Sequence, residues 1–388
     1  MKRILILLNA LIVFTLFSCN NSGVKGDMPV SMELSIYDSI DLPDARGFEV
    51  FDYDAKRDLF LGVLGEEIVC FSKDKEVFRF NRFGNGPEEY SYSLFFRKSS
   101  PRFDTDTSIM INNNQYLKYY DYKGNFIKSV RIDTAHPTAK RMIMGRYKDK
   151  YVFQGDNTYT KADLEDFPDE SVFYQKAPQF FVASFDSNFT RPYGHLPKES
   201  IIMQKNRAFE GFKPRLSYNK SRGRVDILYS ADQKLFSFPL DHPETYSYIQ
   251  LDPNHFTEQQ FQATKTRPDA NICSRMMALN TYYYYFYSQG DTIMTGYFPG
   301  VPEDVLDEEL PHTKIKNNYR EVINKYLHFY LDVYVDGKKK TGDILMQKGC
   351  MITYLGGLNN IIVWKENDIV KNGQPMKRLY FARLKDIQ

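Results

Sequence analysis

Residues 59–80 read LFLGVLGEEIVCFSKDKEVFRF and contain three short runs of apolar and aromatic residues. The runs are Leu59–Val63, Glu67–Phe71 and Glu76–Phe80, and Gly65-Glu66 and Lys73-Asp74-Lys75 form the turns between them. Val, Ile and Phe suit half-buried strands, and runs of about five residues between turn signals are typical of β-structure. This stretch therefore predicts one small sheet of short strands.

Similar groups of strand-like runs recur along the rest of the chain. The strand before the outer turn of each group ends near Phe71, Tyr122, Phe185, Pro239, Tyr334 and Leu384. The spacings are 51, 63, 54, 95 and 50 residues, and a four-stranded propeller blade takes about 40–50 residues. Closing such blades into a ring protects their sheet edges. We therefore predict an all-β fold, a six-bladed β-propeller over residues 31–388, with Met32–Tyr37 completing the final blade.

Helical patterns fall in the longest spacing. Thr257–Thr266 begins with Thr-x-x-Gln, which is a capping-box pattern, and Asp304–Leu310 and Lys316–Tyr326 also fit short helices. These segments predict a small helical insertion, about residues 255–326, on one face of the ring. Insertions and binding sites tend to collect on such a face.

The N-terminus resembles an export signal. Lys2 and Arg3 precede an apolar run of 14 residues, Ile4–Phe17, whereas a membrane span needs about 20. Leu16-Phe17-Ser18-Cys19 resembles the lipobox of bacterial lipoproteins, which implies cleavage before Cys19 and lipidation of its sulfur. We predict a signal peptide at 1–18, a tether at 19–30 and membrane attachment through this lipid. The tether lacks a dense acidic cluster, which favours the periplasmic face of the outer membrane over the cell surface.

The charge balance of the chain bears on whether it binds nucleic acid. Removal of residues 1–18 leaves 49 basic and 49 acidic residues, whereas a nucleic-acid footprint needs a clustered basic excess. We therefore expect no nucleic-acid partner.

Besides Cys19, the chain has Cys70, Cys273 and Cys350, and three cysteines cannot all pair. We expect Cys70 to be a buried strand residue, and a single Cys273–Cys350 bridge stays open.

Residues 82–90, RFGNGPEEY, directly follow the first predicted blade. They resemble the G-x-G-P-x-E-Y motif of the TolB-like six-bladed β-propeller lipoproteins of Bacteroidota. The resemblance implies an architecture and an envelope location more than an activity.

Two interpretations of this loop are open. In the first, it caps a blade, with Tyr90 packed and Glu88 or Glu89 accepting backbone hydrogen bonds. In the second, it is a candidate binding site formed by Arg82, Asn85, Glu88, Glu89 and Tyr90. Arg82, Asn85 and Glu88 would then line the funnel where the blade loops converge, and an arginine suits a planar anion.

The sequence carries no motif for a metal, a nucleotide or an activated serine. None of the six histidines has a His or Cys three or four residues away, and the Walker A, Rossmann and G-x-S-x-G patterns are absent. We expect no metal and no cofactor. A glycosidase needs two converging carboxylates. Acidic pairs such as Asp104/Asp106 and Glu88/Glu89 exist, but their spacing does not say which carboxylates converge.

Residues 281–287 read TYYYYFY. Alternation along a strand would place Tyr282, Tyr284 and Phe286 on one face and Tyr283, Tyr285 and Tyr287 on the other. The run is either a strand buried between blades or an aromatic platform for a sugar ring.

The leading hypothesis is a non-enzymatic envelope lipoprotein whose loops bind a protein or glycan partner. The alternative is a glycan hydrolase or lyase with carboxylates and tyrosines in the central funnel. A structural role beside an outer-membrane complex is the third possibility.

Overall fold

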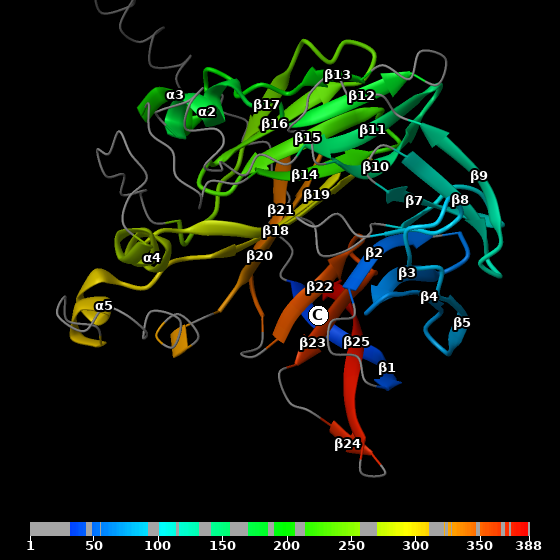
Figure 1. Cartoon of the computed structure of the whole chain (residues 1–388). Coiled ribbons are helices and arrows are strands. Elements are labelled where there is room, and N and C mark those ends of the chain that lie inside the picture. Colours follow the sequence, from blue (N-terminus) through cyan, green and yellow to red (C-terminus); the bar gives the residue numbers. More distant parts are fainter. Residues whose placement is uncertain are drawn as a thin grey trace, which may run out of the picture.

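The computed structural model is a ring of six small antiparallel sheets, as Figure 1 shows. The predicted six-bladed β-propeller is therefore confirmed. The structure describes residues 32–43, 49–54, 56–91, 101–113, 116–131, 141–155, 170–184, 190–205, 214–256, 270–309, 322, 325–326, 328–346, 350–365, 369–371 and 374–386. The predicted signal peptide, the tether and Cys19 lie outside these ranges and stay predictions.

Blades 1 to 3 each contain four strands in chain order. Blade 1 consists of β2 (Glu49–Asp54), β3 (Leu59–Leu64), β4 (Glu67–Phe71) and β5 (Glu76–Phe80). Blade 2 consists of β6 (Pro101–Phe103), β7 (Ser108–Asn113), β8 (Tyr116–Asp121) and β9 (Phe126–Arg131). Blade 3 consists of β10 (Arg141–Tyr147), β11 (Lys150–Gly155), β12 (Phe180–Ser184) and β13 (Thr190–Tyr193).

Blades 4 and 5 repeat this order, and blade 6 takes its last strand from the N-terminus. Blade 4 consists of β14 (Pro214–Asn219), β15 (Arg224–Tyr229), β16 (Lys234–Pro239) and β17 (Ser247–Gln250). Blade 5 consists of β18 (Tyr282–Gln289), β19 (Thr292–Phe298), β20 (Tyr330–Val335) and β21 (Lys338–Leu345). Blade 6 consists of β22 (Cys350–Leu355), β23 (Ile361–Lys365), β25 (Gln374–Asp386) and β1 (Met32–Pro43), with β24 (Ile369–Lys371) paired to β25.

The ring is closed by β1, as the sequence predicted for Met32–Tyr37. This strand pairs antiparallel with β25 from Met32↔Asp386 to Pro43↔Met376, with one irregularity at Tyr37. The two ends of the propeller are thereby joined by a hydrogen-bonded ladder. Blade 6 cannot leave the ring without breaking this ladder, which protects the sheet edges that an open ring would expose.

Aromatic and aliphatic side chains fill the space between neighbouring blades. Phe60 of blade 1 lies between Phe71, at 5.4 Å, and Phe381 of blade 6, at 5.3 Å between ring centroids. Between blades 2 and 3, the buried hydroxyls of Tyr119 and Tyr151 share a 2.7 Å hydrogen bond. The high aromatic content of the chain is therefore used largely to join sheets, and Cys70 is a fully buried strand residue as expected.

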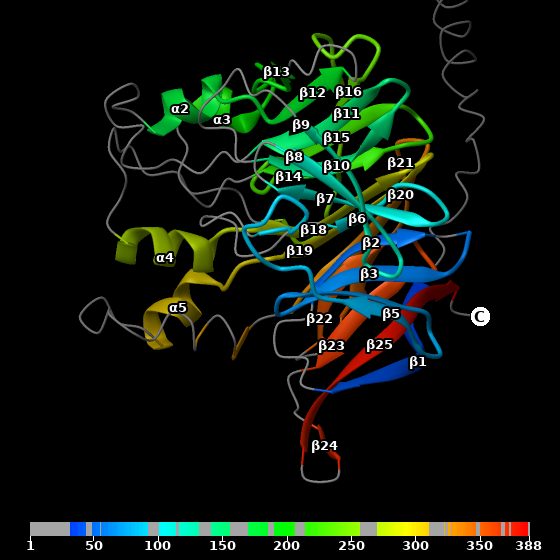
Figure 2. The same ribbon diagram turned by 45° about the vertical axis from the view of Figure 1, so that its right-hand side comes forward.

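In the described ranges, four helices lie in connections between strands. They are α2 (Glu170–Lys176), α3 (Ile201–Lys205), α4 (Ala270–Leu279) and α5 (Glu303–Glu309). All four emerge on the face where the first strands of the blades begin, and both helix pairs lie on one side of the strands in Figure 2. None of the helices in the described ranges is long and apolar enough to cross a membrane.

The helix predictions are partly confirmed. Helix α5 matches the predicted Asp304–Leu310, whereas the sequence did not predict α2, α3 or α4. The predicted Thr257–Thr266, most of Lys316–Tyr326 and the Cys273 side chain lie outside the described residues.

Candidate binding site in the central cavity

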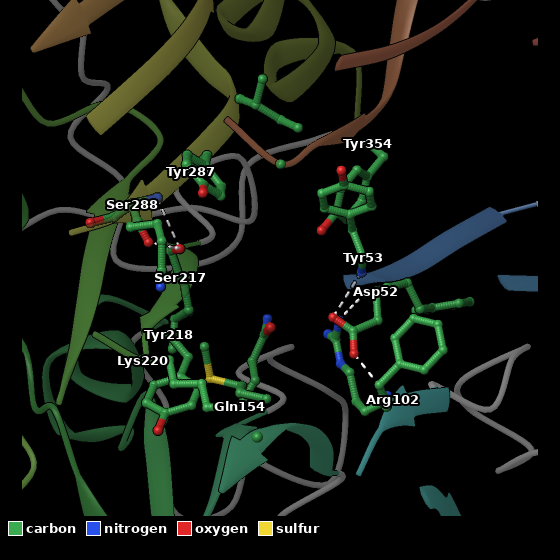
Figure 3. A pocket seen from close by; sticks show the side chains of 18 of the residues that line it. Asp52, Tyr53, Arg102, Gln154, Ser217, Tyr218, Lys220, Tyr287, Ser288 and Tyr354 are labelled. Atoms are coloured by element: carbon green, nitrogen blue, oxygen red, sulfur yellow. Dashed lines mark hydrogen bonds and ion pairs between the residues drawn. The ribbon is translucent and has the colours of Figure 1, made fainter. Parts of the chain in front are cut away.

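The first strands of the six blades surround a central cavity of about 880 Å³, part of which Figure 3 shows. This volume lies within the range of small-molecule sites. The cavity is lined mostly by these inner strands and by the turns that follow them: residues 51–54, 102–106, 110, 144–146, 154, 214–218, 220, 284–289 and 352–356. Every blade therefore contributes to one site.

In four blades, the register between the inner strand and the second strand is irregular at one point. The shifts leave one extra residue in each strand, namely Phe51 in β2, Met144 in β10, Tyr284 in β18 and Thr353 in β22. All four extra residues line the cavity. Bulges of this kind redirect side chains and are common beside functional sites. Because a bulge recurs at the cavity in four of the blades, the same backbone feature shapes much of the cavity wall.

The alternation predicted for the tyrosine run is wrong, because a bulge at Tyr284 interrupts the strand. Tyr283 packs between blades 4 and 5, whereas Tyr285 and Tyr287 pack toward blade 6, so these three residues do not share a face. The run begins as a buried strand at Tyr282 and continues into the cavity wall from Tyr284 onward. The first half of the run therefore fits the interpretation of a buried strand, whereas the second half lines the cavity, and its use as a platform for a sugar ring stays a prediction.

Asp52 and Arg102 hold the inner strands of three blades together. The Asp52 carboxylate accepts hydrogen bonds from Tyr53 N at 3.0 Å and Phe103 N at 2.9 Å, and it lies 3.8 Å from the Arg102 guanidinium. Arg102 also donates to the carbonyl oxygens of Phe51 and of Ile143, the latter at 3.1 Å. Burial raises the pKa of Asp52, and the nearby Arg102 opposes that shift. Figure 3 shows this group on one wall of the cavity.

The other lining carboxylates also have partners. Asp54 pairs with Arg57 at 2.6 Å, Asp104 pairs with Arg146 at 2.9 Å, and the exposed Asp106 lies 3.7 Å from Lys56. The sequence pair Asp104/Asp106 therefore does reach the cavity, but Asp104 is neutralised there by an arginine.

Several cavity tyrosines are hydroxyl donors over the whole physiological pH range. Burial raises the pKa of Tyr218, Tyr285 and Tyr287 to about 12. The Tyr218 hydroxyl donates to Arg146 O at 2.7 Å. These side chains offer neutral rings and hydroxyl groups, not phenolate charge, to anything bound in the cavity.

The motif loop 82–90 lies away from this cavity, since none of its residues is among those that line it. Tyr90 is fully buried, and its hydroxyl donates to Glu66 O at 2.7 Å. Glu89 accepts from Gly86 N at 2.8 Å, and a Cβ on Gly84 would collide with the same carboxylate. These contacts support the interpretation that the loop caps blade 1.

The same loop also joins blade 1 to blade 2. Tyr120 of blade 2 donates to Glu88 O at 2.9 Å, and Arg82 donates to Gly124 O at 3.2 Å. The expectation that Arg82, Asn85 and Glu88 line the funnel is corrected, because backbone packing between the two blades decides where the loop lies. The three side chains are exposed at that position, and binding by them stays a prediction.

Within the described ranges, no group of three or more His, Cys, Asp or Glu residues is arranged to hold a metal ion.

The comparison with known proteins finds similarity in the fold. No family model matches the chain, and no curated protein matches it. A crystal structure of a member of the DUF4221 family from Bacteroides vulgatus is similar over 93% of this chain and 100% of that chain, with a TM-score of 0.63 and 10% identity. A protein described as exported, from Bacteroides fragilis, is similar over 94% of this chain and 98% of that chain, with a TM-score of 0.49 and 12% identity. At 10% identity, the likeness to the DUF4221 member concerns the propeller fold and leaves the ligand open.

Proposed function

We propose that the protein is an envelope-anchored, non-enzymatic binding module that takes a glycan in its central cavity. The observation that carries this proposal is the cavity of about 880 Å³, whose lining includes six tyrosines contributed by blades 1, 4, 5 and 6: Tyr53, Tyr218, Tyr284, Tyr285, Tyr287 and Tyr354. The anchoring part rests on the sequence signal that ends at Cys19.

A tyrosine-rich wall suits a sugar ring because both have two kinds of surface. The phenol ring is flat and apolar, and its hydroxyl forms hydrogen bonds at the rim. Polar side chains such as Gln154 and Ser217 lie among the rings in Figure 3 and would orient a bound hydroxyl-rich ligand.

The concave shape favours a glycan over a folded protein. Stable protein–protein interfaces bury about 800 Å² on each partner and are formed by extended surfaces. A cavity enclosed by six strands instead admits a small molecule or the end of a chain.

One observation favours the enzymatic alternative, in which the cavity is a hydrolase or lyase site. Asp52 lines the cavity and burial raises its pKa, as a general acid requires. Against this, both of its carboxylate oxygens already accept backbone hydrogen bonds. We therefore assign Asp52 to the scaffold of the wall.

The test is a binding screen of the mature protein against an array of oligosaccharides, followed by calorimetry on the best ligand. Tyr287→Ala is expected to weaken binding by at least ten-fold, because it removes a cavity ring. Tyr116→Ala, which removes an exposed ring from β8 outside the cavity, is the matched control and should leave affinity unchanged. Absence of binding to any saccharide refutes the proposal, and cleavage of a bound saccharide that Asp52→Asn abolishes would favour the enzyme.

A further inference from the structure

We propose that the cavity selects an acidic saccharide, with carboxylate or sulfate groups, and that Arg215 and Lys220 are its counter-ions. This inference rests on the proposed function, because it names the class of glycan that the cavity would take.

Arg215 is the second residue of β14, the inner strand of blade 4, and it lines the cavity. Its side chain is accessible to solvent, and no residue in the described ranges forms a hydrogen bond or ion pair with its guanidinium. Tyr284 and Tyr285 are the ionisable side chains that interact electrostatically with it. Enclosure in the cavity lowers the pKa of the guanidinium, and the two tyrosines oppose that shift.

The contrast with the other cavity arginines points to a ligand. Arg102 bridges two carbonyl oxygens and Asp52, and Arg146 pairs with Asp104. A guanidinium presents five donors in a planar fork that matches a carboxylate or a sulfate group. None of the residues that the structure describes occupies this fork on Arg215, which lies inside an enclosed site where an anion would interact with it more strongly than in bulk water.

Lys220 provides a second cation on the same wall. It directly follows the last residue of β14, lines the cavity and is exposed, and it forms no ion pair with any residue for which the structure gives a position. It lies five positions after Arg215 in the chain, and this offset corresponds to roughly 16 Å along an extended strand. Its charge reaches across the cavity, since it lowers the pKa of Asp52 against the larger effect of burial.

The charges are distributed unevenly around the cavity. The four lining carboxylates, Asp52, Asp54, Asp104 and Asp106, all belong to blades 1 and 2, whereas Arg215 and Lys220 belong to blade 4. Figure 3 shows Lys220, Ser217 and Tyr218 on one wall, and Asp52 and Arg102 on the other. A ligand with two anionic groups spaced along a chain of rings would lie along blade 4, with a cation at each end of β14 and tyrosines beside it.

The experiment compares oligosaccharides that share a ring and differ in charge. The probes are galactotetraose, its uronic acid counterpart and its 6-sulfated counterpart, together with the same three members of the glucose series. Calorimetry is run on the mature full-length protein at low and high salt. We expect an acidic member of at least one series to bind at least ten-fold more tightly than its neutral parent. High salt should weaken the binding of that acidic member and leave the affinity for the neutral parent unchanged.

Charge variants then locate the effect. Arg215→Gln should weaken binding of the acidic member by about ten- to hundred-fold. Lys220→Gln should weaken it less, because an ammonium group cannot form the two parallel hydrogen bonds that a guanidinium forms with a carboxylate or a sulfate. Arg191→Gln is the matched control, because it removes an exposed arginine from β13 outside the cavity, and it should have no effect. Since Arg215 has no partner in the described structure, its variant should melt no lower than the wild type.

The outcomes separate the two proposals. Preference for the uronic acid or for the sulfate identifies the anionic group. Equal binding of neutral and acidic members overturns the acidic inference and leaves glycan binding intact, whereas no binding of any member overturns glycan binding itself. Tight acidic binding that survives both Arg215→Gln and Lys220→Gln overturns the assignment of these residues.

Discussion

A buried carboxylate between blades 4 and 5 allows a quantitative test of how the ring is held together. Asp226 in β15 is fully buried and accepts hydrogen bonds from Ser237 at 2.5 Å, from Ser288 at 2.5 Å and from Arg224 at 3.1 Å. Ser288 belongs to β18, the inner strand of blade 5, so this carboxylate connects two blades directly beside the cavity. We predict that Asp226→Ala destabilises the propeller.

The magnitude follows from the groups that the substitution leaves behind. The buried Ser288 hydroxyl, the half-buried Ser237 hydroxyl and one guanidinium lose their acceptor, and hydrogen bonds to a charged group contribute about 1.5–3 kcal/mol each. Removing one partner of a buried pair costs about 3–5 kcal/mol in all. Arg224 is partly exposed and regains some hydration, so we expect a loss of about 3–4 kcal/mol. For the roughly 270 residues that the structure describes, at about 2.1 cal/mol/K each, this corresponds to a fall in Tm of about 5–7 °C.

The assay is urea unfolding followed by circular dichroism, with Tm from calorimetry. Asp226→Asn keeps an amide oxygen that still accepts from the serines, so it should lose about half as much as Asp226→Ala. Asp74→Ala, which alters an exposed turn residue, should stay within about 0.5 kcal/mol of the wild type. A loss below about 1 kcal/mol for Asp226→Ala would refute the argument that this carboxylate fastens the two blades.

Three further predictions concern pH, the motif loop and the anchor. Burial raises the pKa of Asp332 to about 6 from its usual 3.8, so the folded state holds an extra proton between these values and loses stability as pH rises through them, by about 3 kcal/mol in total. Asp332→Asn should lack this loss, and a Tm difference from the wild type that stays constant from pH 4 to pH 7 would contradict it. Tyr90→Phe should cost about 1 kcal/mol in urea unfolding, because Glu66 O loses its 2.7 Å donor; an unchanged midpoint argues against a capping role. Cys19→Ala should move the protein from the detergent phase to the aqueous phase in detergent partitioning, whereas continued partition into detergent would exclude this anchor.

The strands that the sequence predicted well are the middle and outer strands of the blades. Leu59–Val63, Glu67–Phe71 and Glu76–Phe80 correspond closely to β3, β4 and β5. Their residues alternate between buried and exposed positions or are buried on both faces, so hydrophobicity and turn signals mark them clearly. The closing strand β1 was found for the same reason.

The strands that the sequence missed are mainly the inner ones, which form the candidate site. β2, β6, β10, β14 and β22 were not predicted, and only β18 was, through its tyrosines. β6 has three residues, and bulges interrupt β2, β10 and β22. Their side chains face a polar cavity, so Asp52, Arg102 and Arg215 occupy positions where the strand pattern requires apolar residues. The predicted groups of strands lacked their first strand in a regular series, and this regularity was the signal that could have located the inner strands.

The chain composition and turn spacing determined that this protein is a ring of small sheets, because local strand preference and hydrophobic alternation are properties of neighbouring residues. The N-terminal pattern likewise predicts the lipid anchor without any fold. Only the tertiary structure decided that the motif loop 82–90 caps a blade and that Arg215 and Lys220 face the central cavity. Those positions depend on closing six distant strands around one axis, and on which charged neighbours that closure brings within reach of each side chain.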